Sequence, residues 1–160
     1  MEFTSVAADP FSILTIVVAP AVLTNASSVL ALGTTGRLAR VADRIHAVSA
    51  LIAKIEPGAG NFALIATELA TLETRAHLLL LAVRFFFIGL GLFASSALIA
   101  IAGSIAVYFS EPAVFRIAAA IGVLFGASAV ISLVCGCVLM IRETQLAVES
   151  LAREAKAHLS

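Results

Sequence analysis

Residues 85–110 read FFFIGLGLFASSALIAIAGSIAVYFS and contain no Asp, Glu, Lys or Arg. Residues 10–36 and 117–141 are equally free of charge, so the chain holds uncharged stretches of 27, 26 and 25 residues. A helix needs only about 20 apolar residues to cross the hydrocarbon core of a bilayer. The sequence therefore predicts an all-α integral membrane protein with three long transmembrane helices, over about 11–34, 85–109 and 117–141.

The composition agrees with a membrane protein. Hydrophobic residues make up 61% of the chain and charged residues 12%, and the mean hydropathy is +1.10. Soluble domains average roughly half apolar and a quarter charged residues. The formal net charge is zero, which argues against nucleic acid as a partner, because such binding needs a basic surface that displaces counterions from phosphate. The length of 160 residues predicts a single membrane domain, 1–160.

The distribution of cations predicts the orientation. Of the ten Lys and Arg residues, only Arg116 lies between the second and third uncharged stretches. Under the positive-inside rule the side that carries the other cations is cytoplasmic, which places the N-terminus outside and the C-terminus in the cytoplasm. Residues 1–9 contain two acids and no base, unlike the n-region of a cleavable signal peptide, so we expect the first helix to be retained.

The predicted cytoplasmic segments have a helical period. Between residues 37 and 56, apolar residues recur at alternating spacings of three and four, as in a coiled coil: Leu38, Val41, Ile45, Val48, Ile52 and Ile55. A turn sequence follows at residues 57–61, after which the same period resumes. We predict a cytoplasmic helical hairpin over 37–84 and a C-terminal helix over 142–160, joined in an antiparallel helical bundle. Helices this short are marginal alone, so we expect self-association.

The sequence resembles a known family at the point where the first span meets its basic flank. The run from Leu30 to Ile45, LALGTTGRLARVADRI, and the run from Leu72 to Leu79, LETRAHLL, are similar to a bacterial family of small membrane proteins known as a domain of unknown function. The resemblance extends over about residues 10–141. It implies the same three-span layout and location in the bacterial inner membrane, and it brings no catalytic assignment.

Three arginines follow the first uncharged stretch, at Arg37, Arg40 and Arg44. They lie close to the expected membrane surface, where anionic lipid headgroups attract basic side chains. We expect them to contact membrane lipids, and a bound anion or nucleotide is the alternative.

A polar patch interrupts the first span at Thr24, Asn25, Ser27 and Ser28. Asn is costly in hydrocarbon unless its amide is hydrogen-bonded, so these residues must face protein or water. They form either interhelical hydrogen bonds or the lining of a pore around an oligomer axis.

Small residues in the other two spans predict close packing of helices. Gly122 and Gly126 form a GxxxG pattern in the third span, and Gly89 and Gly91 lie in the second. Such positions let two backbones approach closely, either within the subunit or between copies.

The sequence predicts no cofactor, no metal site and no enzyme activity. Cys135 and Cys137 point about 200° apart on a helix and can neither pair nor share a metal. No acid or base lies inside an uncharged stretch, and no nucleophile elbow or phosphate-binding loop occurs. Two functions remain. The first is a structural, assembly or accessory-subunit role, with other copies or other membrane proteins as partners. The second is a homo-oligomeric channel lined by the first span.

Overall fold

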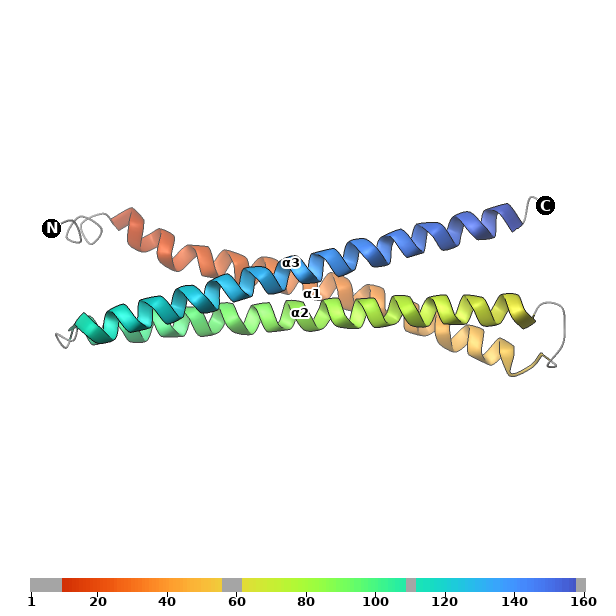
Figure 1. Ribbon diagram of the computed structural model, residues 1–160, viewed down its shortest axis with the longest axis horizontal. Helices are drawn as coiled ribbons and strands as arrows, with labels where there is room; N and C mark the ends of the chain where they lie inside the picture. Colours follow the sequence, from red (N-terminus) through yellow and green to blue (C-terminus); the bar gives the residue numbers. More distant parts are fainter. Residues whose placement is uncertain (1–9, 56–61, 109–111, 158–160) are drawn as a thin grey trace. The chain divides into compact units, whose positions relative to one another are not determined.

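A computed structural model describes residues 10–55, 62–108 and 112–157, and it is helical throughout, apart from the few residues that follow the first helix (Figure 1). Helix α1 spans Pro10–Ile52, α2 spans Phe62–Tyr108 and α3 spans Pro112–Ala157. Both α1 and α3 begin at proline, which suits the first turn because its missing N–H has no partner there. The predicted all-α fold is confirmed. The predicted turn at 57–61 lies outside the described residues.

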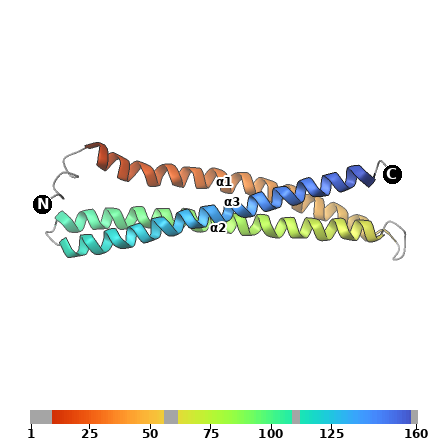
Figure 2. The same cartoon turned by 45° about the horizontal axis from the view of Figure 1, so that its top comes forward.

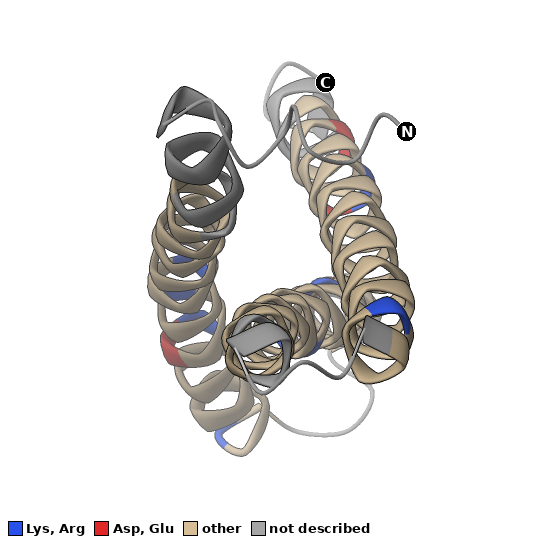
Figure 3. Ribbon diagram, turned by 90° about the vertical axis from the view of Figure 1, so that its left-hand side faces the viewer, with Lys and Arg blue, Asp and Glu red and all other residues tan. Residues whose placement is uncertain are grey.

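The chain divides into two compact units. Unit 1 contains residues 1–30 and 86–133, and unit 2 contains residues 31–85 and 134–160, so each helix contributes to both. Among the described residues of unit 1, Arg116 alone is charged. All other charged residues of the described chain, drawn in blue and red in Figure 3, belong to unit 2. Among the described residues, the unit defined by packing as unit 1 is thus nearly free of charge, and unit 2 carries nearly all of the charged residues.

Unit 2 is a three-helix assembly with its own apolar core. Its segments of α1 and α2 run close together, and α3 lies against them near Met140 and moves away from them toward its C-terminal end (Figures 1 and 2). The core consists of four buried residues and the half-buried residues packed on them: Val41, Val48, Leu72 and Leu79, with Leu38, Ile45, Ile52, Ile65, Leu69, Ala76 and Met140. Five of the six residues of the apolar period predicted on α1 lie in this cluster. The spacing of three and four thus correctly predicted which face of α1 packs against the other helices of unit 2.

The sixth residue of that period, Ile55, lies beyond the end of the helix. The amide of Lys54 bonds to the carbonyl of Leu51 at 3.0 Å, and that of Ile55 bonds to the carbonyl of Ile52 at 3.2 Å. These bonds span three residues instead of four and mark the tightened last turn of a helix. The first arm of the hairpin is therefore slightly shorter than its apolar period suggested.

In unit 1, α2 and α3 pack through small residues. The Ser96 hydroxyl on α2 donates a hydrogen bond to the Gly122 carbonyl on α3 at 2.8 Å. A Cβ atom added at Gly103 would lie 3.0 Å from the Cβ of Ala118, and one at Gly89 would lie 3.4 Å from the Ala129 carbonyl oxygen. These glycines allow the two helices to approach closely.

Two of the three helices are long and apolar enough to cross a membrane. Among the described residues, the qualifying segments are Phe62–Gly103 and Ala113–Ser150, with hydropathies of 2.3 and 2.4. Only 17% of the most apolar window of each segment is buried inside the chain, whereas the core helix of a soluble protein is mostly buried. Most of the apolar surface of these two segments is therefore not covered by the described part of the chain.

Candidate functional site

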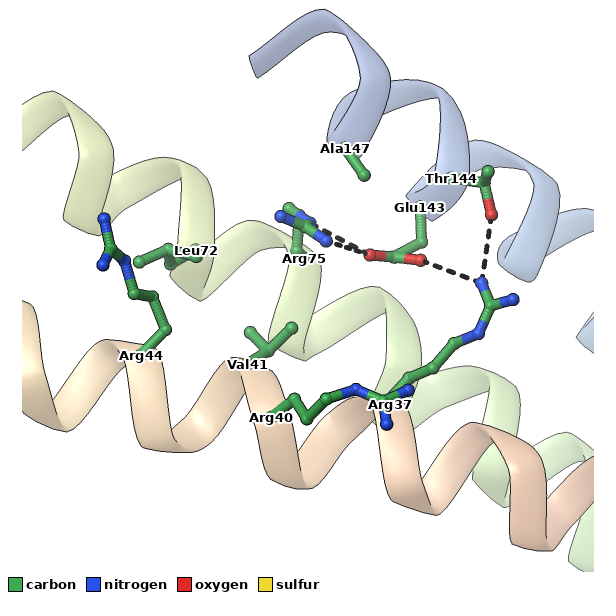
Figure 4. Close-up of a pocket in the computed structure, with 9 residues that line it drawn as sticks. All are labelled: Arg37, Arg40, Val41, Arg44, Leu72, Arg75, Glu143, Thr144 and Ala147. Carbon is green, nitrogen blue, oxygen red and sulfur yellow. Dashed lines mark hydrogen bonds and ion pairs between the residues drawn. The ribbon is translucent and has the colours of Figure 1, made fainter. Parts of the chain in front are cut away.

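A buried carboxylate joins the three helices of unit 2. Glu143 on α3 is 3% exposed. Its Oε1 accepts hydrogen bonds from Nε and Nη2 of Arg75 on α2, at 2.9 and 2.8 Å. Its Oε2 lies 3.9 Å from Nη1 of Arg37 on α1. Figure 4 shows both guanidinium groups converging on this carboxylate from different helices. A buried charge needs such partners, because desolvation would otherwise make it very costly.

Around this carboxylate lies an open cavity of about 360 Å³. Its lining combines four arginines with one carboxylate, one hydroxyl and three apolar side chains: Arg37, Arg40, Arg44, Arg75, Glu143, Thr144, Val41, Leu72 and Ala147 (Figure 4). We call it the arginine cavity. The formal charge of its lining side chains is strongly positive, since a single carboxylate faces four guanidinium groups.

The four arginines of the arginine cavity differ in how strongly they are engaged. Arg75 is held by Glu143, and Arg44 is held by Glu68, whose Oε1 accepts bonds from its Nη2 at 2.7 Å and its Nε at 3.1 Å. Arg37 has only longer contacts, at 3.4 Å to the Thr144 hydroxyl and 3.9 Å to Glu143. Arg40 is exposed and makes no ion pair within the described residues. Arg37 and Arg40 therefore retain N–H donors for a ligand.

The structure brings the three predicted arginines together and adds two residues that sequence reasoning missed. Arg37, Arg40 and Arg44 all line the cavity, and Arg75 and Glu143 complete it. Arg75 had a weak signal, since it belongs to the run from Leu72 to Leu79 that resembles the family. Glu143 follows the third uncharged stretch closely, and nothing in the local sequence marks it as buried.

The polar patch of α1 does not form one surface. Ser27 is fully buried and donates to the Leu23 carbonyl at 2.7 Å. Ser28, half-buried, donates to the carbonyl of Thr24 at 3.0 Å. Thr24 is half-buried as well, whereas Asn25 is exposed. The two serine hydroxyls thus satisfy themselves within their own helix, and Asn25 alone presents its amide outward.

The predicted packing glycines also differ from one another. Gly89 meets Ala129 and Leu133, and Gly122 and Gly126 face Ser96, so all three lie at the contact of α2 and α3. Gly91 has no neighbouring atom within 4 Å of an added Cβ. Gly103, which sequence reasoning did not select, makes the closest approach.

The cysteines are free and half-buried. In the part of the chain that the structure describes, no group of three or more His, Cys, Asp or Glu residues is arranged to hold a metal ion.

Arg84 is exposed and lies at the end of the α2 segment of unit 2, next to the second uncharged stretch. Because α2 and α3 are antiparallel and Arg75 pairs with Glu143, the ninth residue beyond Arg75 lies level with Val134. That level is about 13 Å along the helices from the Glu143 carboxylate. It falls within the third uncharged stretch, 117–141, so the predicted ends of the second and third spans, at 85 and 141, do not lie at the same height.

Comparison with known proteins gives a family and no function. The family described as "Protein of unknown function (DUF2721)" matches residues 17–153. No curated protein matches the chain, and no solved structure does. The chain belongs to this family of unknown function, which confirms the resemblance noted at the Arg-rich end of the first uncharged stretch.

Proposed function

We propose that this protein is a three-span bacterial inner-membrane protein that acts by assembly, as a self-associating structural or accessory subunit. In this proposal α1 crosses the membrane together with α2 and α3, the N-terminus lies outside, and the charged part of unit 2 stands in the cytoplasm. The apolar, weakly buried surfaces of α2 and α3 support membrane residence. The observation that carries the assembly role is the exposed amide of Asn25.

Asn25 lies in a stripe of exposed side chains on α1. Val18, Val22 and Val29 are all exposed and lie seven and three residues before Asn25 and four residues after it. Spacings of three and four place these four residues on one face of the helix. The stripe has the composition of a helix interface with one polar residue at its centre. We call it the Asn25 stripe.

The amide of Asn25 favours another copy of the chain as the partner. In hydrocarbon an unpaired amide costs several kcal/mol, so it must find a hydrogen-bond partner outside the described part of its own chain. An amide both donates and accepts, so two Asn25 side chains related by twofold symmetry can bond each other. A single Asn within an apolar seam is also a known device for fixing register and oligomeric state.

Self-association is testable in purified protein. In a mild detergent, light scattering should give the mass of an oligomer. Asn25→Val should lower the association constant about fivefold, which corresponds to roughly 1 kcal/mol for one hydrogen bond between membrane helices. The control is Leu23→Val, which changes an exposed residue that lies neither three nor four residues from any member of the stripe. A monomeric wild-type protein, or equal effects of the two substitutions, would refute self-association through α1.

The orientation can be tested by labelling single cysteines with a membrane-impermeant maleimide, after Cys135 and Cys137 have been changed to Ala. Ala53→Cys and Ala113→Cys introduce exposed thiols near opposite ends of the chain's helices. In intact cells whose outer membrane is permeable to the reagent, we expect labelling at 113 only. Labelling at 53 would overturn the proposed orientation.

A homo-oligomeric channel is the second candidate, and the same exposed amide favours it. If several copies met around an axis, Asn25 would form a ring of neutral polar groups flanked by the half-buried Thr24 and Ser28. Purified protein in liposomes should then conduct ions or small solutes, and Asn25→Leu should abolish the flux. If the protein is oligomeric but shows no flux, the channel hypothesis is wrong and the assembly role remains.

A further inference from the structure

We infer that the arginine cavity of unit 2 binds a phosphate group. This inference is independent of the proposed assembly, because every residue that it uses belongs to one unit of one chain. The group could belong to a phospholipid headgroup or to a free phosphate compound, since the recognising chemistry is the same for both.

The charge of the cavity points to an anion. Glu143 and Glu68 engage Arg75 and Arg44, which leaves Arg37 and Arg40 without a close carboxylate. The contact between Arg37 and Glu143, at 3.9 Å, is at the limit of an ion pair. Asp43, three residues after Arg40, is exposed and does not line the cavity. Two positive charges thus remain at the mouth of the cavity.

The geometry of arginine points to phosphate among anions. A guanidinium presents several N–H donors in a planar fork that matches two oxygens of a phosphate or carboxylate. Arg37 and Arg40 are three residues apart on α1, so their side chains leave the same face of the helix. Two such forks on one face can surround a tetrahedral group with more than two acceptor oxygens, which a carboxylate lacks.

Glu143 preorganises the cavity. Its buried carboxylate fixes the guanidinium of Arg75 with two bonds to one oxygen, so a ligand does not have to order that side chain. Apolar side chains of Val41, Leu72 and Ala147 form the rest of the lining beside the charges. A less polar wall strengthens the interaction between the arginines and a bound anion.

The position of the cavity favours access from the membrane surface. Arg37 is the first charged residue after the uncharged stretch 10–36, and Glu143 follows the stretch 117–141 by two residues. A lipid headgroup can reach this level if the hydrocarbon ends close to these first charged residues, at 37 and 142. A soluble phosphate compound can reach the same open cavity from water.

Binding can be measured on the full chain in a neutral maltoside detergent by the shift of its thermal unfolding temperature. The probes are inorganic phosphate, phosphatidylglycerol and, as a lipid without net charge, phosphatidylcholine. Arg37→Gln and Arg40→Gln remove the two weakly engaged arginines. Arg142→Gln is the matched control, because Arg142 is exposed beside Glu143 and does not line the cavity. Circular dichroism checks that each variant remains helical.

We expect saturable stabilisation by phosphatidylglycerol or phosphate, weakened about tenfold or more by Arg37→Gln or Arg40→Gln and unchanged by Arg142→Gln. Stabilisation by phosphate and phosphatidylglycerol together assigns a general phosphate site, and stabilisation by phosphatidylglycerol alone assigns a lipid site. If neither probe binds, or if Arg142→Gln weakens binding as much as Arg40→Gln, the inference is overturned. These results do not depend on the oligomeric state, so they stand apart from the test of Asn25.

Discussion

Glu143 shows how one residue can hold three helices of unit 2 at a common level. Its carboxylate is buried, one oxygen takes two bonds from Arg75, and the other faces Arg37. Buried ion pairs add little over a well-packed apolar contact, but the loss of one partner leaves the other charge uncompensated. We therefore expect the pair to act mainly on specificity, since a shift of α3 along α2 would leave both charges without a partner.

Replacing Glu143 with Ala should lower the free energy of unfolding by about 2–3 kcal/mol. The value lies below the usual range for a fully buried pair because Arg75 retains 21% exposure of its side chain. Chemical unfolding in detergent, followed by circular dichroism, measures it. Glu73→Ala is the control, because Glu73 is an exposed carboxylate on the same stretch of α2. Equal losses in the two variants would contradict a structural role for the pair.

At the scale of the elements, α2 and α3 of unit 1 pack closely where a small residue of one helix lies opposite the other helix. Ser96 meets Gly122, Gly89 meets Ala129, and Gly103 makes the closest approach. Each contact depends on the absence of a side chain at one position. A substitution therefore acts according to what lies opposite, and the residue type alone does not decide its effect.

Gly103→Val should destabilise the protein by about 1–3 kcal/mol, since its added Cβ alone would lie 3.0 Å from the Cβ of Ala118 and force the helices apart. Gly91→Val should be neutral or slightly stabilising, because nothing lies within 4 Å of an added Cβ there and valine is a better helix former than glycine. Thermal unfolding of both variants in detergent provides the comparison. A smaller effect at 103 than at 91 would show that this contact does not constrain the helices.

Sequence periodicity predicted the elements better than it predicted their contacts. The spacing of three and four from Leu38 to Ile52 identified the buried face of α1, because a helix repeats its own faces along the chain. The pairing of Arg75 with Glu143 depends on the register between two helices, which no local pattern contains. For the same reason the sequence did not show that Gly103 lies at a helix contact and Gly91 does not, or that Ser27 is buried and Asn25 exposed.

For the whole molecule, the level of Arg84 along the helices bears on where the proposed membrane surface would lie. Arg84 is level with Val134, several residues inside the third uncharged stretch. Side chains on a helix point toward its N-terminus, and for α2 that direction leads toward Arg75 and the charged part of unit 2. Arg84 can therefore extend its guanidinium toward the headgroups while its aliphatic stem stays in hydrocarbon. In the proposed membrane arrangement the exposed Val138 and Ile141 would then contact lipid.

The membrane surface can be located with Val138→Cys in a chain without its two natural cysteines. We expect a membrane-impermeant maleimide to leave this thiol unlabelled in inverted membrane vesicles, because the position lies in lipid. Ala53→Cys should be labelled in the same vesicles, and denatured samples should react at both positions. Labelling at 138 as fast as at 53 would place the surface at the level of Arg84 and shorten the third span.

The hydrogen bonds of the serine hydroxyls also bear on how the chain is made. In α1, Ser27 and Ser28 donate to carbonyls four residues earlier, and Ser128 of α3 donates to Leu124 in the same way. These hydroxyls need no second helix as a hydrogen-bond partner. Ser96 donates across to α3, which is synthesised later. The Ser96 hydroxyl therefore gains this acceptor only once α3 has been made and has packed against α2.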